Sequence, residues 1–157
     1  MTAHWLLKEE PTHYAFADLV RDGRTAWSGV HNATALRHLR SMKVGDEGIF
    51  YHSGDERACV GILRIASAPR PDPDDDRGSY LVEVRPVRAL ARPVPLSEIR
   101  ADPAFAGFDL LRISRLSVLP VPSPMWDRLI ALSGAPGPTA GPKGRGRGSA
   151  RRSAPGP

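Results

Sequence analysis

The sequence predicts an α+β domain built on a small curved or closed sheet. Apolar runs of strand length recur along the chain and are separated by turn residues. Short segments with helical apolar spacing lie between these runs. The segments do not alternate in the βαβ order that a parallel sheet needs, which favours an α+β arrangement. At 157 residues, of which 41% are hydrophobic, the chain is expected to form one folded domain.

The first expected elements are a short strand at residues 4–7 and a short helix after it. The helix is predicted because Phe16, Leu19 and Val20 have helical spacing. It is expected to end at Asp22-Gly23, because glycine is common just beyond the last turn of a helix.

A second helix is expected after an extended segment at residues 25–27. Asn32 belongs to the residue types that are preferred at helix N-caps. Ala35, Leu36 and Leu39 follow at helical spacing, so the segment reads as an amphipathic helix.

Three further strands are expected in the middle of the chain, at residues 48–52, 59–66 and 80–86. A turn at residues 54–56 separates the first two. Residues 69–78 contain three prolines and four aspartates, and this composition predicts a solvated loop before the third strand.

The last third combines short helices with one more strand. Residues 96–100 could form one helical turn, and Asp102-Pro103 is expected to start another. Residues 116–120 read as a strand that ends at a proline. Ser123 is expected to cap a final helix that has Pro124 at its first position and packs Trp126 inward.

The C-terminal part of the chain, residues 134–157, is expected to be a disordered tail outside the domain at residues 1–133. It is almost entirely Gly, Pro, Ala, Ser and Arg, with no apolar residue larger than alanine, so it cannot offset the entropy of ordering. Five of the 22 basic residues lie in it, and 17 basic residues remain against 17 acidic ones. Such an arm fits loose attraction to phosphates, or a solubilising terminus.

The composition argues against several classes of site. Cys59 is the only cysteine, which excludes an intrachain disulfide and a cysteine-rich zinc site. It lies in an apolar run and is expected to be a buried, inert thiol. The five histidines lack metal-ligand spacing, and no metal or cofactor is expected. Neither a membrane span nor a signal peptide is evident, so no membrane contact is expected and the cytoplasm is the expected compartment.

Aromatic and polar residues interleave in three strings of the first third, at residues 4–11, 27–32 and 50–54. A pocket for a flat, polar ring needs aromatic side chains for the ring faces and short donors and acceptors for the ring edges. The strings therefore predict a pocket for a base-like ligand.

Each candidate in these strings has a structural alternative. Trp27 is the first candidate for a stacking platform, because Gly29 would let a planar ligand approach the backbone; the alternative is a core tryptophan. Asn32 either pairs with a base edge or caps the following helix. Tyr51 and Ser53 point to one face of their strand and offer hydroxyls to a base edge, or they form an ordinary strand end.

Glu9 and Arg115 are two charged candidates. Glu9 and Glu10 should point to opposite sides of an extended segment, so they are not expected to share a catalytic site. At the edge of a pocket, Glu9 would favour a ligand that presents an amino donor. Arg115 is a candidate for a phosphate or sugar contact, or else a surface arginine. The expected base-pocket residues are Lys8, Glu9, Trp27, Ser28, Gly29, Val30, Asn32, Tyr51 and Ser53, and the expected phosphate or sugar contacts are His31, Arg115 and Ser117.

The strings also resemble those of the EVE domain family, a PUA-like group. The matching segments are Trp5-Leu6-Leu7-Lys8 with Glu10-Pro11, Trp27-Ser28-Gly29-Val30 with Asn32, Met42-Lys43-Val44-Gly45-Asp46, Phe50-Tyr51-His52-Ser53, Val60-Gly61-Ile62 and Ser114-Arg115-Leu116-Ser117-Val118. Their order and spacing agree over about residues 3–132. The resemblance implies a mixed β-barrel of PUA type flanked by short helices, with a pocket for a modified nucleobase and no need for a metal or a catalysed reaction.

Four positions depart from the family's pattern. Glu9 stands where the family commonly has serine, and His31 stands where it commonly has arginine. Ala33 and Leu36 replace an aromatic residue and a cation after Asn32. These departures bear on the identity of the ligand more than on the fold.

The predicted function is therefore that of a monomeric, non-catalytic nucleic-acid-binding module. It would read a modified cytosine or adenine in DNA, or a modified base in RNA. One alternative is an RNA-binding accessory protein of RNA modification, because PUA-type folds are associated with RNA-modifying enzymes. Another is a small nucleotide-acting hydrolase, which would need an acid–base or metal constellation that the sequence does not display.

Overall fold

The computed structural model describes residues 2–134, so the expected tail lies, apart from Gly134, outside the described residues. The strands are β1 (His4–Glu9), β2 (Thr25–Trp27), β3 (Glu47–His52), β4 (Ala58–Ile65), β5 (Arg70–Pro71), β6 (Tyr80–Pro95) and β7 (Val118–Pro120). The helices are α1 (Phe16–Asp22), α2 (Ala33–Arg40), α3 (Leu96–Ala101), the short 3-10 helix η1 (Pro103–Phe105), α4 (Asp109–Arg112) and α5 (Ser123–Leu132).

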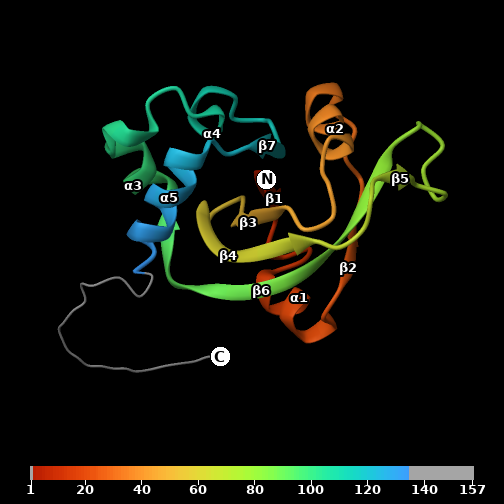
Figure 1. Cartoon of the computed structure of the whole chain (residues 1–157), viewed down its shortest axis with the longest axis horizontal. Helices are drawn as coiled ribbons and strands as arrows, with labels where there is room; N and C mark the ends of the chain where they lie inside the picture. The colour runs from red at the N-terminus through yellow and green to blue at the C-terminus, as the bar shows by residue number, and fades with distance from the viewer. Residues whose placement is uncertain (1, 135–157) are drawn as a thin grey trace.

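A mixed sheet organises these elements. Its strands lie in the order β2-β6-β4-β3-β1-β7, and β5 pairs with β6 beside this path. β1 and β3 run parallel, whereas the other neighbouring strands are antiparallel. The sheet curls into a half-barrel along β6, which runs from β5 at one end to α3 and α5 at the other (Figure 1). This architecture confirms the predicted fold class.

An aromatic cluster around Phe50 forms the centre of the core. The Phe50 ring makes edge-to-face contacts with Phe16 and Trp27, with ring centroids 5.5 Å and 5.4 Å apart. Gly61 in β4 makes room for this cluster, because a Cβ atom there would lie 2.5 Å from the Phe16 ring. The predicted burial of Cys59 is confirmed, and burial raises the pKa of its thiol to about 12.

Asp46 anchors the start of β1. Its buried carboxylate accepts hydrogen bonds from the Trp5 indole N–H at 3.0 Å, the Lys43 backbone N–H at 3.0 Å and the Ala3 backbone N–H at 3.1 Å. Trp5 is buried with its polar atom satisfied, so it has a structural role.

β6 is longer than the sequence predicts, because it continues from Pro86 to Pro95. Prolines and exposed residues in this stretch obscured the strand pattern. Antiparallel pairing with β4 resumes after a register shift, with Cys59 opposite Val94 and Ala58 opposite Pro95.

Three smaller predictions need correction. Ser123 does not cap α5: it is the first helical residue, Pro122 occupies the N-cap position, and Pro124 comes second, where a missing N–H is tolerated. The proline- and aspartate-rich loop contains the two-residue strand β5, and α4 was not predicted.

Within residues 2–134, no helix combines the length and the apolar character that crossing a membrane would require.

Candidate functional site

Two hollows on the protein contain residues that the sequence singles out. The first, which we call the Trp27 hollow, has a volume of about 200 Å³. It lies where the end of β1, the segment before α1 and the end of β2 meet. Its lining residues are Glu9, Tyr14, Thr25, Ala26, Trp27 and Ser28.

Trp27 is both a wall of this hollow and a core residue. Only 5% of its surface is exposed, and its ring packs edge-to-face on Phe50 with an interplanar angle of 85°. Backbone pairing with Val82 of β6 fixes its position in the sheet. The two alternatives for Trp27 are therefore compatible, because a core residue can present one edge or face to a hollow.

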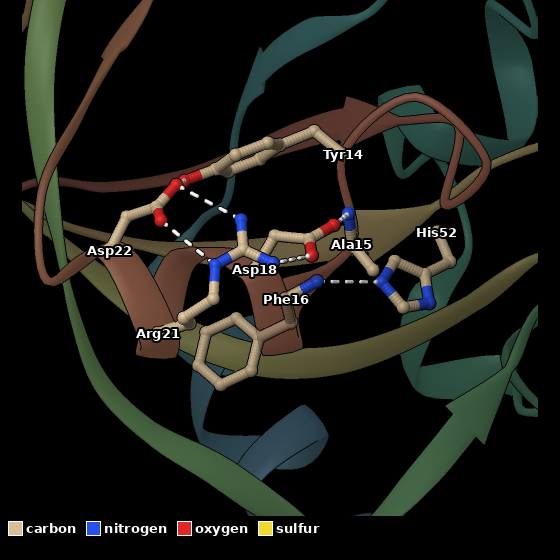
Figure 2. Close-up of polar contacts among 7 residues, drawn as sticks. All are labelled: Tyr14, Ala15, Phe16, Asp18, Arg21, Asp22 and His52. Atoms are coloured by element: carbon tan, nitrogen blue, oxygen red, sulfur yellow. Dashed lines mark hydrogen bonds and ion pairs between the residues drawn. The ribbon is translucent and has the colours of Figure 1, made fainter.

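Tyr14 supplies a second aromatic ring that the sequence analysis missed. Its hydroxyl donates a hydrogen bond to the Asp22 carboxylate at 2.8 Å, which ties the residue to the end of α1 (Figure 2). Arg21 pairs with the same carboxylate at 3.0 Å. Burial, followed by the Asp22 hydrogen bond, raises the pKa of Tyr14, so the ring stays a neutral phenol at physiological pH.

His52 fixes the start of α1 and thereby the segment that carries Tyr14. Its Nε2 accepts a hydrogen bond from the Phe16 backbone N–H at 3.1 Å (Figure 2). Its Nδ1 pairs with the Glu56 carboxylate at 2.9 Å. The Asp18 carboxylate accepts from the Ala15 backbone N–H at 2.8 Å, which satisfies another donor at this helix end.

Glu9 supplies the carboxylate that lines the Trp27 hollow. Burial raises its pKa, while the Glu10 backbone hydrogen bond and His13, whose Nδ1 lies 3.7 Å from the carboxylate, lower it by less. The Glu9 backbone carbonyl accepts from the Ser53 N–H at 2.9 Å, so the ends of β1 and β3 are held together. Burial of a carboxylate favours a ligand that brings a hydrogen-bond donor to it.

The second hollow, which we call the Lys8 hollow, has a volume of about 250 Å³. Its polar lining residues are Lys8, Tyr51, Ser53, Arg57, Arg100 and Ser114, and its apolar side chains are Leu96, Leu110 and Leu111. The Lys8 ammonium donates to the Ser114 carbonyl at 3.0 Å and lies 5.7 Å from the centroid of the Tyr51 ring. Burial lowers the pKa of Lys8.

The expected base pocket is thus divided between two hollows. Lys8 and Glu9 are neighbours in β1, and strand alternation sends their side chains to opposite faces of the sheet. Tyr51 and Ser53 lie with Lys8, as their alternation along β3 predicts, whereas Trp27 lies with Glu9.

The segment after Trp27 contributes less to either hollow. Ser28 lines the Trp27 hollow, and Gly29 has φ +76 with open space where a Cβ would lie. Val30 is buried, and its carbonyl accepts from the Ser79 hydroxyl at 2.8 Å. Asn32 caps α2, since its Oδ1 accepts from the Ala35 N–H at 2.9 Å.

None of the three expected phosphate or sugar contacts is among the lining residues of either hollow. His31 pairs through Nε2 with Asp75, and its Nδ1 lies 3.1 Å from the Arg77 guanidinium. Arg115 is exposed. Ser117 is half-buried, and its carbonyl accepts from the Lys8 backbone N–H at 2.9 Å.

Among residues 2–134, no three His, Cys, Asp or Glu side chains are grouped so that they could hold a metal ion.

The curled half-barrel with a few short helices defines a PUA-like domain. The chain belongs to the EVE domain family, whose model matches residues 3–132. It is 33% identical to thymocyte nuclear protein 1 of Gallus gallus, over 82% of this chain and 68% of that protein.

Two solved structures extend the comparison. A Rhodopseudomonas palustris protein solved by NMR is 34% identical, with a TM-score of 0.82 over 87% of this chain and 96% of its own. A crystal structure of human THYN1 protein in complex with DNA that contains 5-methylcytosine is 27% identical. Its TM-score is 0.77, over 84% of this chain and 98% of its own.

Proposed function

We propose that this protein is a non-catalytic module that binds nucleic acid and reads a modified base in the Trp27 hollow, with methylated cytosine in DNA as the first candidate. The observation that carries the proposal is the lining of this hollow, which joins two aromatic rings, a hydroxyl and a partly buried carboxylate. The complex of the related human THYN1 protein with DNA containing 5-methylcytosine supports this choice of ligand.

The chemistry of the hollow matches both the flat face and the polar edge of a base. Stacking of a base on an aromatic side chain contributes roughly 1–3 kcal/mol. A carboxylate accepts a hydrogen bond from the exocyclic amino group of cytosine, and thymine has no such group. Glu9 therefore favours amino-bearing bases, and Ser28 offers a hydroxyl to the base edge.

Reading a base in duplex DNA requires that the base leave the stack, at a cost of a few kcal/mol. Stacking in the Trp27 hollow and the Glu9 hydrogen bond would offset this cost. The basic residues of the chain would add affinity that depends on salt and not on sequence.

We infer binding without turnover because the hollow lacks the parts of a catalytic constellation. Glu9 is the single carboxylate among its lining residues, and that carboxylate faces His13, which is largely exposed. Acid–base catalysis would need a second positioned group at the reacting atom.

The first test compares free nucleosides, since these carry no phosphate for the basic residues to attract. We expect 5-methyldeoxycytidine to bind more tightly than thymidine to the full chain. In a duplex with one modified site, we expect about a tenfold preference for 5-methylcytosine over cytosine, the contribution of one well-packed methyl group. Equal affinities for modified and plain bases across a panel of modifications would overturn the proposal.

The Glu9→Gln variant tests the polar edge of the hollow. We expect it to weaken binding of amino-bearing bases by about tenfold, because the acceptor loses its charge. Glu47→Gln is the matched control, since Glu47 is a half-buried carboxylate at the opposite end of the same parallel strand pair. Tighter binding of the same sequence as RNA at equal salt would redirect the proposal to RNA.

A further inference from the structure

We propose that the Lys8 hollow is a separate binding site for a phosphate group. Its three charged lining residues, Lys8, Arg57 and Arg100, are all cations, and no carboxylate lines it. Cations that converge on one concave surface favour an oxyanion, and arginine forks match phosphate in particular. The proposal does not depend on base reading in the Trp27 hollow.

The cations of this hollow are available to a ligand. None of the three forms an ion pair with a carboxylate of residues 2–134, whereas nearby Arg92 is held by both oxygens of Glu98. Lys8 uses one of its three N–H donors on the Ser114 carbonyl, which leaves two.

The backbone of Arg57 is held in an unusual conformation at this site. Arg57 is the single non-glycine residue of the described range with positive φ, at +47. Its carbonyl accepts from the Leu96 N–H at 2.8 Å, which ties the turn before β4 to the start of α3. The same contact brings Arg57 close to Arg100, which α3 carries, and non-glycine residues in this region occur often at functional sites.

Neutral donors complete the hollow. Burial raises the pKa of Tyr51 to about 12, so its phenol keeps its proton and can donate. Ser53 and Ser114 add hydroxyls. The apolar side chains Leu96 and Leu110 line another part, which suits a phosphate carried on a less polar body.

Three carboxylates lie close to this hollow without being among its lining residues, and that of Glu10 lies against Gly54, which does line it. Asp55 and Glu56 line a neighbouring depression that also contains Arg57 and Arg100. Glu56 is engaged with His52 at 2.9 Å. The residues that line the Lys8 hollow itself are therefore cations and neutral groups, with the Glu10 carboxylate beside Gly54.

The test is a titration of the full chain with inorganic phosphate, followed by NMR at the backbone amides of Ser53, Gly54 and Arg57. Because NMR shifts are assigned to individual residues, phosphate binding in this hollow is distinguished from binding at other basic residues. We expect saturable shifts at these amides. Arg57→Asn with Arg100→Gln should weaken phosphate binding at least about tenfold, since each charged hydrogen bond contributes substantially. Asparagine tolerates the left-handed backbone at position 57.

Arg88→Gln is the matched control, because Arg88 is an exposed arginine of β6 that does not line the Lys8 hollow. It should bind phosphate as the unmodified chain does. Shifts that never saturate, or equal affinity in the double variant and the control, would overturn the proposal. Preference for a modified base is measured separately, so the two proposals can fail independently.

Two further arms identify the source of the phosphate. If the site holds a backbone phosphate of nucleic acid, the double variant should bind plain and methylated DNA more weakly by the same factor. The dependence of DNA affinity on salt concentration should also become less steep. If the site holds a free phosphomonoester, deoxycytidine monophosphate should compete with inorganic phosphate while DNA affinity stays unchanged. Either result supports a phosphate site.

Discussion

The His52 imidazole accepts a hydrogen bond from the Phe16 backbone N–H at 3.1 Å and so joins the end of β3 to the first turn of α1. Both groups are buried. Tyr14 lies two residues before Phe16, so this bond also holds one aromatic wall of the Trp27 hollow. A sheet residue thereby positions a loop residue at the candidate site.

We expect His52→Phe to lower the free energy of unfolding by about 1–3 kcal/mol, because the buried Phe16 N–H loses its acceptor. Urea denaturation measures this change. Glu56→Gln is the control, since it keeps an oxygen for Nδ1 and leaves the Phe16 bond intact. An unchanged stability in His52→Phe would show that the bond does not hold α1.

Trp27→Ala should lower the free energy of unfolding by about 3–5 kcal/mol, the usual result of removing a buried tryptophan. It should also abolish preference for methylated cytosine. Trp126→Ala is matched in residue type and burial, but Trp126 stacks on His4 and not in the hollow. The stability of the Trp126→Ala variant should fall by a similar amount, while its preference for methylated cytosine persists. Loss of preference in both variants would trace the effect to folding.

Asp46→Ala should destabilise the fold by about 3 kcal/mol, because the buried Trp5 indole and the Lys43 amide lose their acceptor. Base preference, measured on the remaining folded protein, should not change. Trp5→Phe removes only the indole donor and should lower the free energy of unfolding by less. A changed base preference in Asp46→Ala would mean that the start of β1 reaches the Trp27 hollow.

The raised pKa of Glu9 predicts opposite pH dependences for stability and selectivity. Between the usual glutamate range and its raised value, the folded state binds more protons than the unfolded state, so Glu9 makes stability fall as pH rises. Selectivity for amino-bearing bases should rise over the same window, because only the ionised carboxylate is a full acceptor. Denaturation and binding from about pH 4 to pH 7 measure both. Glu9→Gln should flatten both trends.

Local features of the fold were predictable from the sequence. Asn32 caps α2 as its residue type and the following apolar spacing indicate, and alternation placed Tyr51 and Ser53 on one face. That Trp27 lies with Glu9 and not with Tyr51 was not predictable, because the strand order puts β6 and β4 between β2 and β3. Tyr14 was missed because its contacts with Asp22 and the hollow depend on tertiary structure.

Under the two proposals, the opposite orientation of Lys8 and Glu9 would let one dipeptide serve two ligand groups. A substitution at Glu9 can alter which base is chosen without touching the cations, and a substitution at Lys8 can alter anion affinity without touching the base edge. Two neighbouring residues of the chain would then act independently in binding. An EVE domain with this arrangement would change its preferred base by one substitution at Glu9 while its affinity for phosphate stayed the same.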